Sequence, residues 1–110
     1  MTNLKDRSCR HCASPDKPYA ADEAAALMSQ LHQGWQVARD GKALRREFTF
    51  TDFFHTMSFV NALAHLANVE DHHPDLEVGY NYCNIVFSTH DAGGLTEKDF
   101  ICAAKTDALP

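Results

Sequence analysis

The hydrophobic pattern is strongest between Phe53 and about Val69, where apolar residues recur every three or four positions. This spacing predicts an amphipathic helix, because residues three and four apart lie on the same helical face. Thr51 or Asp52 is expected to cap its N-terminus. The helix carries two apolar stripes, one of Phe53, Met57, Val60, Ala64 and Ala67 and one of Phe59, Leu63 and Leu66. One stripe should cover a sheet, and the extra width predicts contact with another helix or a second subunit, with a thick core as the alternative.

Alternating apolar and polar residues predict strands on both sides of this helix. Before it, the ranges 35–38 and 43–50 flank the sequence Arg39-Asp40-Gly41-Lys42, whose Asp-Gly pair is typical of a hairpin turn. After it, the range 77–80 is expected to form a short strand, and the range 82–89 a clearer one. These four strands predict two hairpins.

Two further helices complete the predicted order of elements. Asp22 is expected to cap a helix that runs to about His32 and ends at Gly34, and Thr96 opens a final helix with Asp99 as its capping-box partner. The result is an α+β fold with the order helix-strand-strand-helix-strand-strand-helix, in which helices pack on one face of a four-stranded antiparallel sheet. Residues 1–18 are expected to form a poorly ordered N-terminal extension, and residues 19–110 a single domain.

Composition narrows the classes of function. A chain of 110 residues fits one domain, and its net charge of -5 with a pI near 5.7 argues against nucleic-acid binding. The longest apolar runs are only a few residues, so no membrane span is expected. The first residues lack the apolar core of a secretory signal, which favours a cytoplasmic location.

The cysteines give no complete metal motif. Cys9 and Cys12 form a C-x-x-C pair around His11, but a structural zinc site normally needs four ligands, and no second pair follows. Incidental thiols are therefore the favoured interpretation of Cys9 and Cys12, with metal or redox chemistry as the alternative. Cys83 and Cys102 lie in apolar surroundings and are interpreted as small buried residues.

Histidines carry the candidate chemistry. Four of the seven, His11, His32, His55 and His65, lie on the extension or on predicted helices and are expected to be surface or satisfied residues. His72 and His73 are adjacent in a loop that follows Glu70 and Asp71, and Pro74 restricts the geometry of the pair. His90 ends the last predicted strand and can reach the same edge of the sheet. The three imidazoles are expected to converge on one pocket beside acidic residues.

Three interpretations of this histidine cluster are open. Imidazoles take and give protons near neutral pH, which favours metal-free acid–base catalysis. Three histidines also form zinc sites, although adjacent histidines tend to point apart and the H-E-x-x-H helix motif is absent. A purely structural cluster is the third interpretation.

Two segments of the chain resemble the pterin-4a-carbinolamine dehydratases. They are EDHHPDLEVGYN, residues 70–81, and STHDAGGLTEKDF, residues 88–100. The family signature has His-His-Pro, an aromatic residue six positions later, a histidine ten beyond that, and then an aspartate. Here those positions are His72-His73-Pro74, Tyr80, His90 and Asp99, and the resemblance extends over roughly residues 20–106.

The resemblance implies a hydro-lyase that converts 4a-hydroxytetrahydropterin to quinonoid dihydropterin and water, without a metal or other cofactor. His72 and His73 are then the expected proton-transferring pair, and His90 the group that polarises or protonates the leaving hydroxyl. Glu70, Asp71, Pro74 and Asp99 are expected in binding or supporting roles. The family also implies a homodimer or homotetramer, and a role beside an aromatic amino acid hydroxylase.

Two positions depart from the family pattern. Asn68 stands four residues before the first histidine, where the family usually has an acid, so the expectation is either that Glu70 or Asp71 supplies the carboxylate or that the orienting role is weaker. Leu76 stands where some members carry a tryptophan against the pterin ring. Two alternative functions remain: a non-catalytic dimerisation or binding module, and a dehydratase-like protein that acts on another pterin, such as the molybdenum cofactor.

Overall fold

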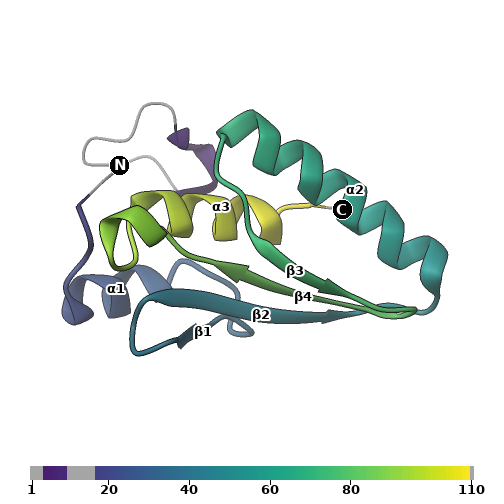
Figure 1. Ribbon diagram of the computed structural model, residues 1–110, viewed down its shortest axis with the longest axis horizontal. Helices are drawn as coiled ribbons and strands as arrows, with labels where there is room; N and C mark the ends of the chain where they lie inside the picture. Colours follow the sequence, from purple (N-terminus) through teal and green to yellow (C-terminus); the bar gives the residue numbers. More distant parts are fainter. Residues whose placement is uncertain (1–3, 10–16, 110) are drawn as a thin grey trace.

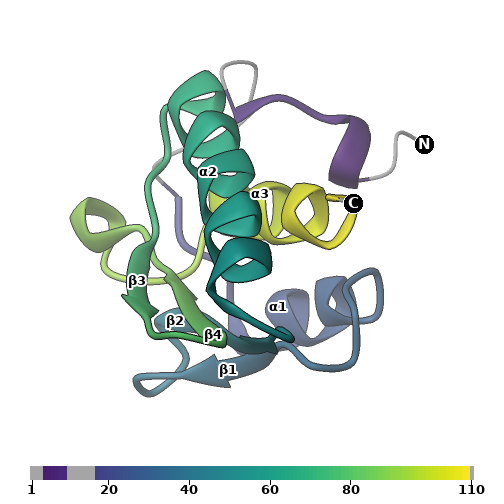
Figure 2. The same ribbon diagram turned by 90° about the vertical axis from the view of Figure 1, so that its right-hand side faces the viewer.

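The computed structural model of the chain describes residues 4–9 and 17–109, except for the side chain of His90. In chain order its elements are η1 (Leu4–Asp6), α1 (Ala21–Met28), β1 (Gln36–Ala38), β2 (Ala43–Thr49), α2 (Phe53–Glu70), β3 (Asp75–Val78), β4 (Tyr82–Phe87), η3 (His90–Ala92) and α3 (Glu97–Asp107). The strands form one antiparallel sheet in the order β1-β2-β4-β3. All three α-helices lie on the same side of this sheet (Figures 1 and 2). The predicted fold class and order of elements are confirmed.

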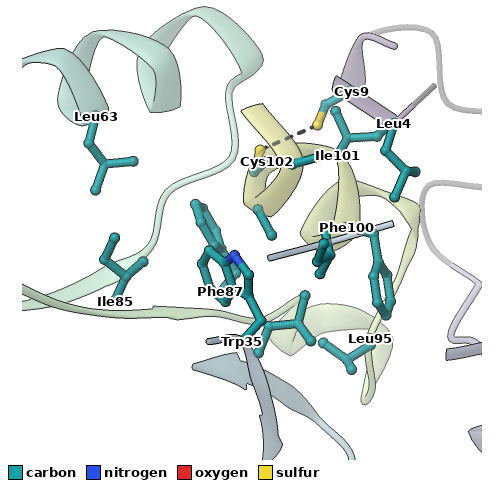
Figure 3. Packing of buried hydrophobic residues seen from close by; sticks show 14 of the residues in the cluster. Leu4, Cys9, Trp35, Leu63, Ile85, Phe87, Leu95, Phe100, Ile101 and Cys102 are labelled. Carbon is teal, nitrogen blue, oxygen red and sulfur yellow. Dashed lines mark hydrogen bonds between the residues drawn. The ribbon is translucent and has the colours of Figure 1, made fainter. Parts of the chain in front are cut away.

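The core forms between the sheet and these helices. Strand β4 alternates as a half-buried strand should: Cys83, Ile85 and Phe87 are fully buried, and the two residues between them are only partly buried. Leu63 of α2 and Phe100 of α3 meet this inner face from the helical layer (Figure 3). The opposite face of the sheet stays open, and every residue of β3 is exposed.

Helix α2 follows its sequence pattern closely. Asp52 is the N-cap, and its side chain accepts a hydrogen bond from the backbone N–H of His55 at 2.9 Å. Its buried residues follow a spacing of three and four and include most of the second apolar stripe; they are Thr56, Phe59, Leu63, Ala67 and Glu70. The first stripe is only partly covered, since Phe53 is 50% exposed. Helix α2 also contacts α3, as its extra apolar width predicts, whereas contact with a second subunit stays a prediction.

Several element ends differ from the sequence prediction. Helix α1 runs from Ala21 to Met28, and its N-cap is Ala20 rather than Asp22; the carboxylate of Glu23 accepts from the backbone N–H of Ala20 at 2.9 Å. Strand β4 ends at Phe87 rather than Thr89. At the other edge, β3 begins and ends two residues earlier than expected.

The turn after β3 explains this shift. The backbone N–H of Gly79 donates to the carbonyl of Tyr82 at 3.0 Å, which closes a turn over residues that were predicted to be strand. Gly79 also lies against the ring of Tyr82, where an added Cβ would approach the ring to 2.1 Å. A larger residue at position 79 would displace the ring of Tyr82 from this position.

The described part of the N-terminal segment packs on the domain. Leu4 is 1% exposed and Cys9 is 5% exposed, and η1 lies against α3. This placement differs from the poorly ordered extension expected over residues 1–18; its remaining residues 1–3 and 10–16, with His11 and Cys12, lie outside the described residues. No helix among the described residues is long and apolar enough to cross a membrane.

Candidate active site

The end of α2 points two adjacent histidines in different directions. Asp71 closes the helix in the left-handed conformation, with φ of 53° and ψ of 42°, and its backbone N–H donates to the carbonyls of Ala67 and Asn68. The backbone N–H of His72 donates to the carbonyl of Ala67 at 3.1 Å. After this reversal the side chain of His72 is buried, whereas His73 is exposed.

His72 is fixed by a carboxylate and an aromatic ring. Its Nε2 lies 2.7 Å from Oδ1 of Asp99, which is 0% exposed. The imidazole also stacks on Phe87, with ring centroids 6.1 Å apart and planes 12° apart. Because a carboxylate can only accept, Nε2 of His72 carries the proton, and the lone pair of a neutral ring resides on Nδ1.

Asp99 is itself held by two threonines. Its Oδ2 accepts from Oγ1 of Thr89 at 2.7 Å and from the backbone N–H of Thr96 at 3.0 Å. The two threonine hydroxyls lie 2.8 Å apart, and since Thr89 donates to Asp99, Thr96 must donate to Thr89. Three donors, the Nε2–H of His72 among them, therefore converge on one buried carboxylate and hold it as a fixed acceptor.

His73 has a different partner. Its Nε2 lies 3.1 Å from the side-chain oxygen of Asn68, one turn back on α2. The amide oxygen accepts only, so it also places the ring proton on Nε2 and leaves Nδ1 with the lone pair. Asn68, the position that departs from the family pattern, thus takes the orienting role that an acid was expected to fill.

The third histidine is placed only through its backbone. His90 begins η3, directly after Thr89, whose hydroxyl contacts Asp99. The backbone at residue 90 therefore lies close to Asp99, the hydrogen-bond partner of His72. The side chain of His90 lies outside the described part of the structure. Its role stays a prediction.

The expected acidic residues of the loop do not contact the histidines. Oε1 of Glu70 accepts from the backbone N–H of Cys9 at 2.8 Å, and Oε2 lies 3.9 Å from Nζ of Lys105. Glu70 does so because it belongs to the buried face of α2. Asp71 is exposed and acts through its backbone as the helix end, and Pro74 is half-buried between His73 and β3. The expectation that Glu70 or Asp71 replaces the family acid is therefore wrong for the described contacts.

The remaining chemistry is sparse. His55 bonds its own helix cap and His65 is exposed, as expected, and His32 accepts from the backbone N–H of Gly34 at 2.9 Å. Among the described side chains no group of three or more His, Cys, Asp or Glu is placed to hold a metal ion.

A cavity of about 480 Å³ between η1 and the ends of α1 and α3 is lined by Leu4, Leu31 and Asp107, not by His72 or His73. Sequence analysis missed Thr89, because a threonine before a histidine carries no motif of its own.

The fold and the site define this protein as an α+β domain in which a buried His–Asp pair lies next to an exposed histidine. The family model for pterin 4 alpha carbinolamine dehydratase matches residues 17–109. A relative from Legionella pneumophila (strain Lens) is 46% identical over 98% of this chain and 96% of its own length. A relative from Nitrosomonas europaea is 50% identical over 99% of this chain and 97% of its own length. Both are provisionally named as pterin-4-alpha-carbinolamine dehydratases. The chain belongs to the pterin-4-alpha-carbinolamine dehydratase family.

Solved structures agree with this membership. A transcriptional coactivator/pterin dehydratase from Brucella melitensis superposes with a TM-score of 0.78 at 32% identity, over 84% of this chain and 97% of its own. A pterin dehydratase-like protein described as a RuBisCO assembly factor in the alpha-carboxysome gives a TM-score of 0.62 at 29% identity, over 70% of this chain and 89% of its own. The fold of the family is therefore shared by proteins with different described roles.

Proposed function

We propose that this protein is a hydro-lyase that converts 4a-hydroxytetrahydropterin to quinonoid dihydropterin and water. The observation that carries the proposal is the hydrogen bonding of the two adjacent imidazoles. Nε2 of His72 lies 2.7 Å from an oxygen of Asp99, and Nε2 of His73 lies 3.1 Å from an oxygen of Asn68. Both rings then offer Nδ1 as a proton acceptor. The full-length relatives named as dehydratases support the same assignment.

The reaction needs one proton withdrawn and one delivered. A base removes the proton from a ring nitrogen of the pterin, and the N–H electrons form the new C=N bond as the C–O bond at position 4a breaks. The departing hydroxyl takes a proton and leaves as water. Near pH 7 a neutral imidazole can accept the first proton, and an imidazolium can deliver the second.

The three histidines divide this work. His73, which is exposed, accepts the proton from substrate bound at the surface, and His72 offers the second basic nitrogen from the buried side. Two bases on one loop serve the two faces of the pterin. His90 delivers the proton to the leaving hydroxyl, while Asp99 keeps the ring of His72 in its orientation.

The direct test is stopped-flow dehydration of enzymatically generated 4a-hydroxytetrahydropterin, with and without a chelator. We expect the wild-type protein to accelerate the reaction equally in both conditions. An inactive protein with normal folding would overturn the enzyme assignment and favour the binding-module alternative. Activity that disappears with the chelator and returns with zinc would favour a metal site, and activity restricted to another pterin would favour the third alternative.

The proposal extends to the surroundings of the enzyme. We infer a cytoplasmic homodimer or homotetramer that recycles the pterin of an aromatic amino acid hydroxylase. The exposed apolar residues of α2 support self-association, since Phe53 and Phe54 are 50% and 74% exposed and Val69 is also exposed. Light scattering tests this part, and a monomer at micromolar concentration would contradict it.

A further inference from the structure

Two cysteines from opposite ends of the chain meet in the core. Sγ of Cys9 lies 3.6 Å from Sγ of Cys102, and the residues are 93 positions apart in sequence. Figure 3 shows the two sulfur atoms facing each other, one from the N-terminal segment and one from α3. Both are free thiols in the structure. The sequence interpretation of Cys9 as an incidental thiol does not account for this pairing.

Hydrogen bonds hold Cys9 in this place. Its backbone N–H donates to Oε1 of Glu70 at 2.8 Å, and its thiol donates to the carbonyl of Lys98 at 3.7 Å. The segment before it is anchored at its far end, where Nζ of Lys105 donates to the carbonyl of Lys5 at 2.9 Å. The packing of η1 on α3 and these hydrogen bonds therefore hold the two sulfur atoms close together.

We propose that Cys9 and Cys102 form an oxidisable dithiol that closes to a disulfide when the protein meets hydrogen peroxide. The sulfur atoms must approach by roughly 1.5 Å to reach the S–S bond length of about 2.05 Å. A side-chain rotation with a small shift of the short N-terminal segment supplies this movement. The proposal is independent of the proposed dehydratase activity.

The chemistry balances with peroxide as the two-electron oxidant. The Cys9 thiol gives up its proton as Sγ attacks one peroxide oxygen, the O–O bond breaks, and the released hydroxide takes up that proton and leaves as water, so that a sulfenic acid remains on Cys9. The sulfur of Cys102 then attacks Sγ of Cys9, the S–O bond breaks, and the departing hydroxide leaves as water with the proton of Cys102. Two thiols and one peroxide thus give one disulfide and two waters.

The two cysteines have different roles in this sequence. The hydrogen bond to Cys9, burial, and the nearby Cys9, Glu70 and Asp99 raise the pKa of the Cys102 thiol. Cys102 therefore stays protonated and acts second, after Cys9 has reacted. Cys9 is also the residue with residual exposure, at 5% against 0% for Cys102.

The disulfide would join the N-terminal segment to the last helix and so enclose nearly the whole domain. Cross-links across loops of about 100 residues restrict the unfolded chain strongly, so we expect Tm to rise by about 10 °C or more. Cys102 also lies one turn after Asp99 on α3, and Cys9 holds Glu70 just before His72. The cross-link therefore fixes to α3 the segment whose backbone holds Glu70 at the end of α2.

The test is peroxide treatment of the full chain, followed by alkylation of remaining thiols, proteolysis and mass spectrometry. We expect a Cys9–Cys102 cross-linked peptide, together with the higher Tm, and reversal of both by dithiothreitol. Cys12→Ala and Cys83→Ala should keep the cross-link, and Cys83→Ala is the matched control because Cys83 is as buried as Cys102. Cys102→Ala and Cys9→Ala should each abolish the cross-link and the rise in Tm.

Three results would overturn the proposal. One is a Cys9–Cys12 disulfide as the main product in the wild-type protein. Another is oxidation of single thiols to sulfinic acid without any cross-link. The last is protection of both thiols from alkylation that a chelator removes, which would show that they bind a metal ion instead.

Discussion

Asp99 and His72 form a buried hydrogen bond, with Oδ1 of the carboxylate 2.7 Å from Nε2 of the imidazole. The carboxylate serves two purposes at once, because its other oxygen accepts from the backbone N–H of Thr96 at the start of α3. The last helix and the orientation of a candidate catalytic ring therefore depend on the same side chain. This arrangement links the folding of α3 to the state of the site.

Replacing Asp99 should damage both properties. In Asp99→Asn the amide N–H₂ would take the place of Oδ2 and face two donors, the Thr89 hydroxyl and the Thr96 backbone N–H. The free energy of unfolding should therefore fall by roughly 1–3 kcal/mol. The ring of His72 would lose its carboxylate acceptor, and kcat/KM for dehydration should fall at least about 10-fold. Urea unfolding and stopped-flow dehydration measure the two effects. Full activity at normal stability would show that Asp99 does not position His72.

Thr89 should act as a positioning residue through Asp99. Thr89→Val removes a hydroxyl that donates to Asp99 at 2.7 Å and leaves the Thr96 hydroxyl without its acceptor. We expect a loss of roughly 1 kcal/mol in the free energy of unfolding, and a several-fold lower kcat at nearly constant KM. Thr89→Ser restores the hydroxyl and should restore kcat. A defect that serine does not rescue would assign the effect to packing.

Asn68 should control the proton position on His73. In Asn68→Leu the ring loses its acceptor, and kcat/KM should fall by roughly 10-fold, while stability changes by less than about 0.5 kcal/mol because both residues are exposed. Asn68→Asp keeps an acceptor and adds a charge that favours the protonated ring. The acidic limb of its kcat/KM profile should therefore move to higher pH. An unchanged profile would argue against His73 as the base.

The cap of α2 predicts a pH dependence of stability. Hydrogen bonds from the backbone and side chain of His55 lower the pKa of Asp52 below its ordinary value of 3.8. Because the pKa of Asp52 is lower in the folded state, the ionised cap contributes to the stability of the fold above pH 3.8. This contribution is lost as the pH falls through the folded-state pKa. Between about pH 6 and pH 3 the urea midpoint of the wild type should fall more than that of Asp52→Asn, which keeps a capping oxygen without the charge. Equal falls would contradict the assignment.

Local patterns predicted most of the fold. The spacing of Phe59 and Leu63 identified the buried face of α2, and the alternation around Ile85 identified β4, because both depend on residues a few positions apart. Strand β3 was placed two residues too late because all of its residues are exposed and its register depends on pairing with β4. The turn at Gly79 was visible only in the structure.

Long-range contacts set the parts of the site that the sequence did not show. The capping role of Asp99 follows from Thr96, three residues away, but its contact with His72 spans 27 residues. Glu70 was misassigned because its partner, the backbone of Cys9, lies 61 residues away in a segment without periodicity. The role of Asn68 beside His73 needed the geometry of the helix end.

The central claim is that His73 exchanges a proton with the substrate. The most direct test compares kcat/KM for 4a-hydroxytetrahydropterin dehydration in wild type, His73→Ala and His65→Ala, where His65 is an exposed histidine of α2. We expect His73→Ala to lose roughly 100-fold or more and His65→Ala to match the wild type, with all three proteins equally stable. Wild-type kcat/KM in His73→Ala would contradict the account.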